Sequence, residues 1–258
     1  MKHTANMFCY QCQETAGCKG CTISGVCGKQ PDVAAMQDLL IYVTKGLAAV
    51  TTQLREESSP VPLEASRMVL TNLFTTITNA NFDKEAIIAR IEETLTQKEE
   101  LLSSVKNSDC LPEAALWNGK RKEFEEKASC VGVLSTENED IRSLRELITY
   151  GLKGLAAYAK HASVLRKEDP KINAFLEHAL AAVLDDRLSA DDLTALALKT
   201  GEYGVQTMAL LDEANTQAYG SPEITKVKIS AGNRPGILVS GHDLRDLEML
   251  LEQTKDTG

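Results

Sequence analysis

The sequence predicts a mainly α-helical protein: two three-helix bundles related by an internal repeat, followed by the first strand–helix unit of a Rossmann-like α/β domain. Three observations support this fold class. Apolar residues recur at helical spacing over the first two hundred positions, one pattern occurs twice, and the last forty residues change to short β-branched runs. The predicted domains are a Cys-rich loop at 1–30, a helical domain at 31–218 with bundles at about 31–108 and 136–218, and an incomplete α/β domain starting at 219–258.

The first half predicts three helices. After Pro31 an apolar stripe continues to about Leu54, and it consists of Leu39, Leu40, Val43, Leu47 and Val50. Two prolines, at positions 60 and 62, end that helix. A second helix is expected at 65–77 and a third after the turn at 79–83, extending to about Leu102.

The second half predicts three more helices. Thr136 and Glu139 fit a capping box ahead of a long apolar stripe, which consists of Ile141, Leu144, Ile148, Leu152 and Leu155. Further helices are expected at 171–184 and 191–214, the second with Ser189 as its N-cap.

An internal repeat relates the two halves. Residues 38–50 have the sequence DLLIYVTKGLAAV, and residues 146–158, 108 positions later, have the sequence ELITYGLKGLAAY. Each copy is followed by two further helical segments. Duplication of a three-helix unit explains this pattern, and chance similarity between two amphipathic helices is the alternative.

The last forty residues predict the opening of an α/β domain. Residues 224–229 and 236–239 are β-branched runs, and Ser240 to Asp243 precede a helix that contains Leu244, Leu247 and Leu251. A single strand–helix unit cannot cover its own sheet edges. We therefore expect the chain to stop within a domain and to expose an apolar surface around 227–251, where missing strands would dock.

Composition excludes several partners. The formal net charge is −9 and the pI is about 5.1, whereas phosphate binding requires clustered Lys and Arg. We find no stretch approaching the roughly 18–20 apolar residues of a membrane helix. Residues 1–7 lack the apolar core of a secretory signal. We expect a cytoplasmic protein that binds neither nucleic acid nor a membrane.

Five of the seven cysteines lie close together, in the spacing Cys9-x2-Cys12-x5-Cys18-x2-Cys21-x5-Cys27. In a reducing compartment such a group is typical of metal binding. The crowding favours an iron–sulfur cluster over a zinc ribbon, whose two C-x2-C pairs are usually separated by roughly a dozen residues or more. Zinc and redox-active thiols are the alternatives. Four thiolates suffice, and the spacing does not choose between Cys18 and Cys27 as the spare.

The two remaining cysteines, Cys110 and Cys130, are distant from this group and single. We expect both to be small buried apolar residues.

Several motifs together resemble the hybrid cluster proteins, also called prismane proteins or hydroxylamine reductases. They are MFCYQCQET at 7–15, GCT at 20–22, GVCGK at 25–29, TENEDIRSLREL at 136–147 and PGILVSGHDL at 235–244. The resemblance extends over essentially all of 7–258.

This resemblance implies a ligand set for one cluster. In the strict-anaerobe type of the family, N-terminal cysteines with C-x2-C-x8-C-x5-C spacing hold a [4Fe–4S] cluster. Cys9, Cys12, Cys21 and Cys27 match that spacing, which leaves Cys18 as the spare.

The resemblance also implies a second metal centre. The family's N-terminal domain has two three-helix bundles, two α/β domains follow, and a hybrid iron–sulfur–oxygen cluster lies where the three domains meet. His242 matches the family's histidine ligand to this cluster, and we expect it in the first turn of a helix, where the dipole favours neutral imidazole. His161 and His178 are expected at the surface of helices.

The implied activity belongs to a longer parent enzyme, an oxidoreductase that reduces hydroxylamine or a related nitrogen species to ammonia. Electrons would pass from an external donor through the N-terminal cluster. The other ligands of the hybrid cluster lie beyond this sequence, so that cluster is expected only in the full-length protein, and the chain's activity alone stays open. A stand-alone electron-transfer module completed by a partner chain, or by the missing C-terminal part, is the alternative. A structural zinc protein is a third hypothesis.

Overall fold

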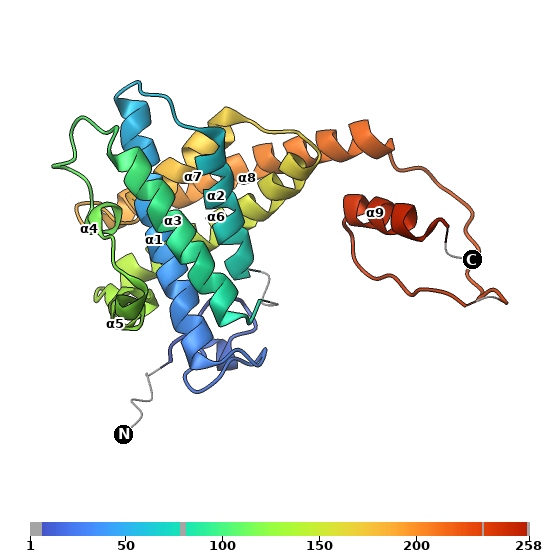
Figure 1. The fold of residues 1–258 in the computed structure, drawn as a ribbon, viewed down its shortest axis with the longest axis horizontal. Helices are drawn as coiled ribbons and strands as arrows, with labels where there is room; N and C mark the ends of the chain where they lie inside the picture. The colour runs from blue at the N-terminus through green and yellow to red at the C-terminus, as the bar shows by residue number, and fades with distance from the viewer. Residues whose placement is uncertain (1–6, 78–80, 234, 257–258) are drawn as a thin grey trace.

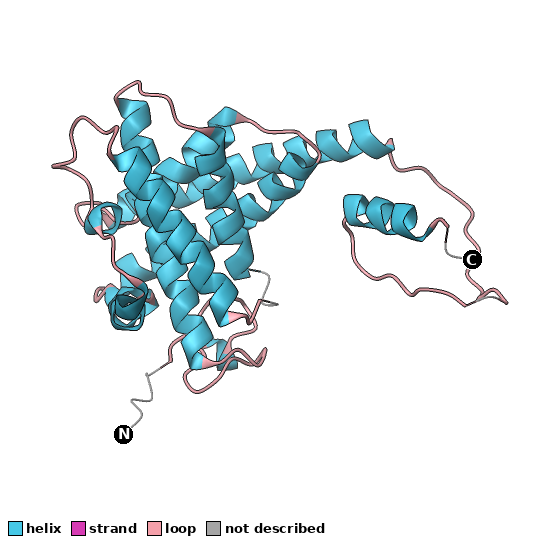
Figure 2. Cartoon of the chain, viewed as in Figure 1, coloured by secondary structure: helices cyan, strands magenta, loops and turns pink. Residues whose placement is uncertain are grey.

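The structure, a computed structural model, describes residues 7–77, 81–233 and 235–256. Within these residues the protein is mainly helical, as predicted, and its helices are joined by loops (Figures 1 and 2). The α-helices are α1 Pro31–Glu56, α2 Leu63–Ile77, α3 Lys84–Leu102, α4 Glu113–Leu116, α5 Phe124–Val131, α6 Glu139–Val164, α7 Pro170–Ala182, α8 Ala190–Tyr219 and α9 Leu244–Thr254. The six long helices expected from the sequence are therefore confirmed; part of the turn at 79–83 lies outside the described residues.

Helix α1 is the central helix of the molecule. Pro31 occupies its first turn. Asp32 lies near the N-terminal, positive end of the helix dipole and Arg55 near the C-terminal, negative end, so both charges stabilise the helix. It packs against α2, α3, α4, α5 and α7, and it is buried over almost its whole surface (Figure 1).

The apolar character of α1 corrects one expectation. By length and composition alone α1 could cross a membrane, with a mean hydropathy of 1.4 over its most apolar window. The prediction that no segment is long and apolar enough is therefore wrong. Burial accounts for the composition, because 83% of that window lies inside the protein.

The two halves have the same order of helices and share a core. Helices α1, α2 and α3 form the first half and α6, α7 and α8 the second, and α2 packs on α6 while α7 packs on α1. The largest buried cluster accordingly contains side chains of α1, α2, α6, α7 and α8. The halves interlock through this cluster, whereas α3 packs with α1, α4 and α5 in a second one. The division into two three-helix bundles and an origin by duplication stay predictions.

The start of α6 differs from the expected capping box. Asn138 is the N-cap, because its side-chain oxygen accepts hydrogen bonds from the backbone N–H groups of Asp140 (3.0 Å) and Ile141 (3.1 Å). Thr136 lies before the helix, where its hydroxyl accepts from Arg145. The expected N-cap at Ser189 is confirmed for α8.

The segment between α8 and α9 contains no strand among its described residues (Figure 2). The strands predicted at 224–229 and 236–239 are therefore not confirmed by this structure, although the helix that follows is present as α9. The physical reason is that a strand needs a neighbour to pair its backbone groups. Ile224, Ile229 and Leu238 are almost fully exposed, and among the described residues no strand pairs with this segment.

Candidate functional site

The cysteine loop, residues 7–30, lies at the foot of α1 (Figure 1). One antiparallel bridge joins its two sides, in which Cys9 and Cys21 exchange backbone N–H···O hydrogen bonds of 3.0 Å. The Thr15 hydroxyl donates to the carbonyl oxygen of Cys9 (3.1 Å). Gly20 has φ 105°, and a side chain there would collide with the ring of Phe8. The loop is therefore a folded element rather than a free segment.

The five cysteines of the loop differ in accessibility. Cys9 and Cys21 are buried, Cys12 is half-buried, and Cys18 and Cys27 are exposed. Two thiols thus face the protein, while Cys18 and Cys27 lie on the solvent side. Exposure alone does not separate these two, so the choice of Cys18 as the spare still rests on the family spacing.

Hydrogen bonds surround the sulfur of Cys21. Burial by itself would raise the pKa of this thiol, but the backbone N–H of Ala16 (3.4 Å), the hydroxyl of Thr15 (3.6 Å) and the backbone N–H of Val26 outweigh it, and the pKa is lowered. Burial raises the pKa of the Cys9 thiol, and Lys29 opposes that rise. N–H donors around a buried thiol favour a thiolate, which is the form that binds metal.

These residues fit an iron–sulfur cluster. Within the described residues, no three His, Cys, Asp or Glu side chains converge on one ion position. A [4Fe–4S] cluster spreads its four thiolate ligands over four irons, so its ligands need not converge on one centre. The absence of a side chain at Gly25 leaves room for the sulfur of Cys27, because a Cβ at position 25 would lie only 2.9 Å from that sulfur. The assignment of Cys9, Cys12, Cys21 and Cys27 as its ligands stays a prediction from the family spacing.

A buried polar network connects the loop to α1 and α6. The side-chain amide of Gln11 donates to Asp38 (2.6 Å), and its oxygen accepts from Lys153. Burial raises the pKa of Asp38 to about 7 and lowers that of Lys153 to about 8. Buried ionisable groups of this kind are common beside functional centres.

Sequence reasoning missed this network. One signal was present: Asp38 and Glu146 occupy the first position of the two repeat copies, and Lys45 and Lys153 the eighth. Glu146 and Asp38 act electrostatically on both lysines, so equivalent residues of the two copies meet beneath the cysteine loop.

The predicted ligand His242 lies away from the cysteine loop, beside the start of α9. It precedes the helix instead of lying in its first turn, because Asp243 is the N-cap and accepts from the backbone N–H groups of Arg245 and Asp246. Asp243 also contacts Nδ1 of His161 on α6 (2.9 Å), and the rings of His161 and His242 are 5.9 Å apart. His161 is therefore half-buried and paired, contrary to expectation.

A cavity of about 690 Å³ adjoins these two histidines, between α9 and the ends of α2 and α6. The structure thus leaves space beside His242. The other histidine expected at the surface, His178, is exposed as predicted.

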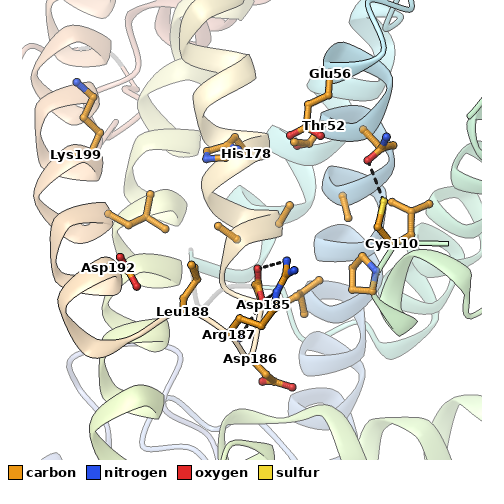
Figure 3. Close-up of a pocket in the computed structure, with 18 of the residues that line it drawn as sticks. Thr52, Glu56, Cys110, His178, Asp185, Asp186, Arg187, Leu188, Asp192 and Lys199 are labelled. Carbon is orange, nitrogen blue, oxygen red and sulfur yellow. Dashed lines mark hydrogen bonds and ion pairs between the residues drawn. The ribbon is translucent and has the colours of Figure 1, made fainter. Parts of the chain in front are cut away.

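A cavity of about 880 Å³ lies away from the cysteine loop between α1, α7 and α8 (Figure 3). Cys110 lies at its edge, exposed, with its thiol 3.7 Å from Gln53. Cys130, near the end of α5, is also exposed. The prediction that both are buried is wrong, because both lie in peripheral segments outside the shared core.

Comparison with known proteins gives a consistent result. The chain matches the Prismane/CO dehydrogenase family over residues 7–258. It is 60% identical to a hydroxylamine reductase of Clostridium perfringens, 58% identical to one of Desulfovibrio desulfuricans and 56% identical to one of Acetivibrio thermocellus. Each alignment covers 98% of this chain but only 46–47% of the relative. The chain thus spans about half the length of these relatives.

Proposed function

Because this chain belongs to the Prismane/CO dehydrogenase family, we propose that it is the N-terminal portion of a hydroxylamine reductase and holds the iron–sulfur cluster through which electrons enter. Cys9, Cys12, Cys21 and Cys27 are the proposed ligands of a [4Fe–4S] cluster. The observation that carries the proposal is the folded loop, in which Cys9 and Cys21, both with buried thiols, are paired through their backbones and the sulfur of Cys21 accepts a hydrogen bond from the backbone N–H of Ala16.

The proposed reaction is the reduction of hydroxylamine by two electrons and two protons to ammonia and water. A bound cluster supplies one-electron transfer. The chain's own residues set how an electron arrives: Cys27 is exposed, with Val26 and Ile23 exposed beside it, so an external donor can approach this side of the loop. Cys9 and Cys21 face the interior, toward the rest of the protein.

The second metal centre would be shared with the rest of the parent enzyme. His242 is the one ligand we propose from this chain for the hybrid cluster, and the others would come from the part that corresponds to the second half of the relatives. The exposed apolar side chains of 224–239 support such a completion, because contiguous apolar surface is normally covered. On this proposal the two runs become strands of a Rossmann-like domain when their neighbours are present.

The test of electron entry uses the full-length protein, in which the second half follows residues 1–258. Cys21→Ala is expected to lower ammonia formation from hydroxylamine at least tenfold with a protein electron donor, while the electron paramagnetic resonance (EPR) signal of the hybrid cluster stays. Cys18→Ala is the matched control and is expected to keep the wild-type rate. An unchanged rate in Cys21→Ala would contradict the electron-entry role.

A stand-alone electron-transfer module that a partner chain completes is the second candidate, since the exposed segment 224–239 needs a cover on either hypothesis. Hydrogen exchange of this segment distinguishes them. Protection only in the presence of a co-purified partner favours the module, and protection by a second half on the same chain favours the reductase.

The seven free cysteines fit the reducing cytoplasm that we propose as the location.

A further inference from the structure

Lys29, the second residue after Cys27, is a buried lysine whose ammonium contacts no carboxylate among the described residues. Its side chain is only 1% exposed. Its ammonium donates to the side-chain oxygen of Gln37 on α1 (2.5 Å) and lies 4.0 Å from the sulfur of Cys9. By contrast, the buried carboxylate of Glu177 is paired with Arg55 at 2.5 Å.

A buried ammonium is costly unless an opposite charge compensates it. The oxygen of Gln37 offers only a dipole, and the amide is held in that orientation because its nitrogen donates to the backbone oxygen of Asn81 (3.3 Å). Asp38 lies within electrostatic range, but its hydrogen bond goes to Gln11, and burial raises its pKa to about 7, so its charge is incomplete near neutral pH. The remaining contact of Lys29 is sulfur.

A thiolate-bound cluster would supply the missing negative charge. Four thiolates outweigh the positive charge of a [4Fe–4S] core, so the site is anionic in both redox states and gains one further negative charge on reduction. Lys29 lies beside a buried thiol: its ammonium is 4.0 Å from the sulfur of Cys9, and both side chains are buried. The ammonium therefore lies on the buried side of the proposed site.

We infer that Lys29 is the buried counter-cation of the N-terminal cluster and raises its reduction potential, with Gln37 as the residue that positions it. This inference rests on the proposed function. A fixed positive charge stabilises the reduced, more negative state more than the oxidised one. Burial keeps solvent and salt from screening it. Lys29 thus makes the cluster easier to reduce by an external donor.

The experiment is a redox titration of the anaerobically purified chain, followed by EPR, with iron and sulfide counted in every sample. In Lys29→Met the ratio of reduced to oxidised cluster at the wild-type midpoint is expected to fall at least tenfold, which corresponds to about 59 mV for one electron. Lys29→Arg keeps the charge and is expected to stay near wild type. Lys19→Met removes an exposed charge from the same loop and is expected to change the ratio less than twofold.

Gln37→Glu is an independent variant, because a carboxylate beside Lys29 cancels its charge without removing it. We expect its midpoint to fall in the same direction as that of Lys29→Met. A full cluster with an unchanged midpoint in either variant would overturn the inference. Loss of the cluster in Lys29→Met together with its retention in Lys29→Arg would support the inference, because only the arginine variant keeps the positive charge. Absence of iron and sulfide from the wild-type chain would instead contradict the proposed function.

Discussion

Two glycines at the same position of the repeated pattern have opposite surroundings, which gives a matched pair of substitutions. A Cβ added to Gly46 in α1 would lie 2.1 Å from the carbonyl oxygen of Ala114 in α4. A Cβ added to Gly154 in α6 would meet nothing within 4 Å. Gly46 is thus required for the close approach of α4 to α1.

The expected free energies follow from these contacts. In Gly46→Ala the clash must move α4, at a typical overpacking cost of about 1–3 kcal/mol. That shift also strains the hydrogen bond that the buried Lys98 donates to Ala114 (2.8 Å), and losing it costs about 1–3 kcal/mol. The gain in helix propensity offsets about 1 kcal/mol, so we expect a net loss of about 1–5 kcal/mol. Gly154→Ala keeps only the gain and is expected to stabilise by about 0.5–1 kcal/mol.

The assay is urea unfolding followed by circular dichroism at helical wavelengths. The reasoning predicts a lower midpoint for Gly46→Ala and an equal or higher one for Gly154→Ala. Equal destabilisation by both would refute it, because the effect would then come from the helix itself. A Gly46→Ala protein as stable as wild type would show that α4 does not lie against α1 at this point.

Three further predictions concern a buried carboxyl group, an ion pair and the cysteine loop. The pKa of Asp38, about 7, lies above its ordinary value of 3.8, so the native state binds the extra proton in this window and stability falls as pH rises from about 4 to about 7. Asp38→Asn should reduce that fall by about 1–3 kcal/mol between pH 5 and pH 8 in urea unfolding, and an unchanged slope would contradict the assignment. Glu177→Gln leaves Arg55, which is partly exposed, without its partner and should cost about 2–3 kcal/mol in thermal unfolding; an unaltered melting temperature would show that the pair is not formed. Gly25→Ala forces a methyl group against the sulfur of Cys27, so iron bound per chain should fall while helix content stays, and full iron content would disprove that contact.

Helices were predictable from the sequence because each one satisfies a local rule. The apolar stripe of α1 and the capping box of α8 depend on residues within a few positions of one another. The start of α6 was misplaced because Thr136 and Asn138 are both good caps, and only the backbone geometry selects between them. The type of each helix was thus set by nearby residues, whereas the start of α6 depended on which side chain accepts hydrogen bonds from the first free backbone N–H groups.

Features that depend on distant residues were not predictable in this way. A β-branched run at 224–229 indicates a strand only if another strand pairs with it, and none does within the part of the chain that the structure describes. The lysines 29 and 153 resemble surface residues in the sequence, yet both are buried where the cysteine loop, α1 and α6 meet. The cysteine ligand set was predictable from local sequence only in part. Its spacing is local, but the choice against Cys18 came from the family pattern.

The proposed cluster is tested by the iron and acid-labile sulfide content of the anaerobically purified chain, together with its EPR spectrum. We expect about four irons and four sulfides per chain and a single cubane signal. That signal should be lost in Cys9→Ala and retained in Cys18→Ala. Zinc without sulfide, or a signal that survives in Cys9→Ala and disappears in Cys18→Ala, would contradict the proposed ligand set.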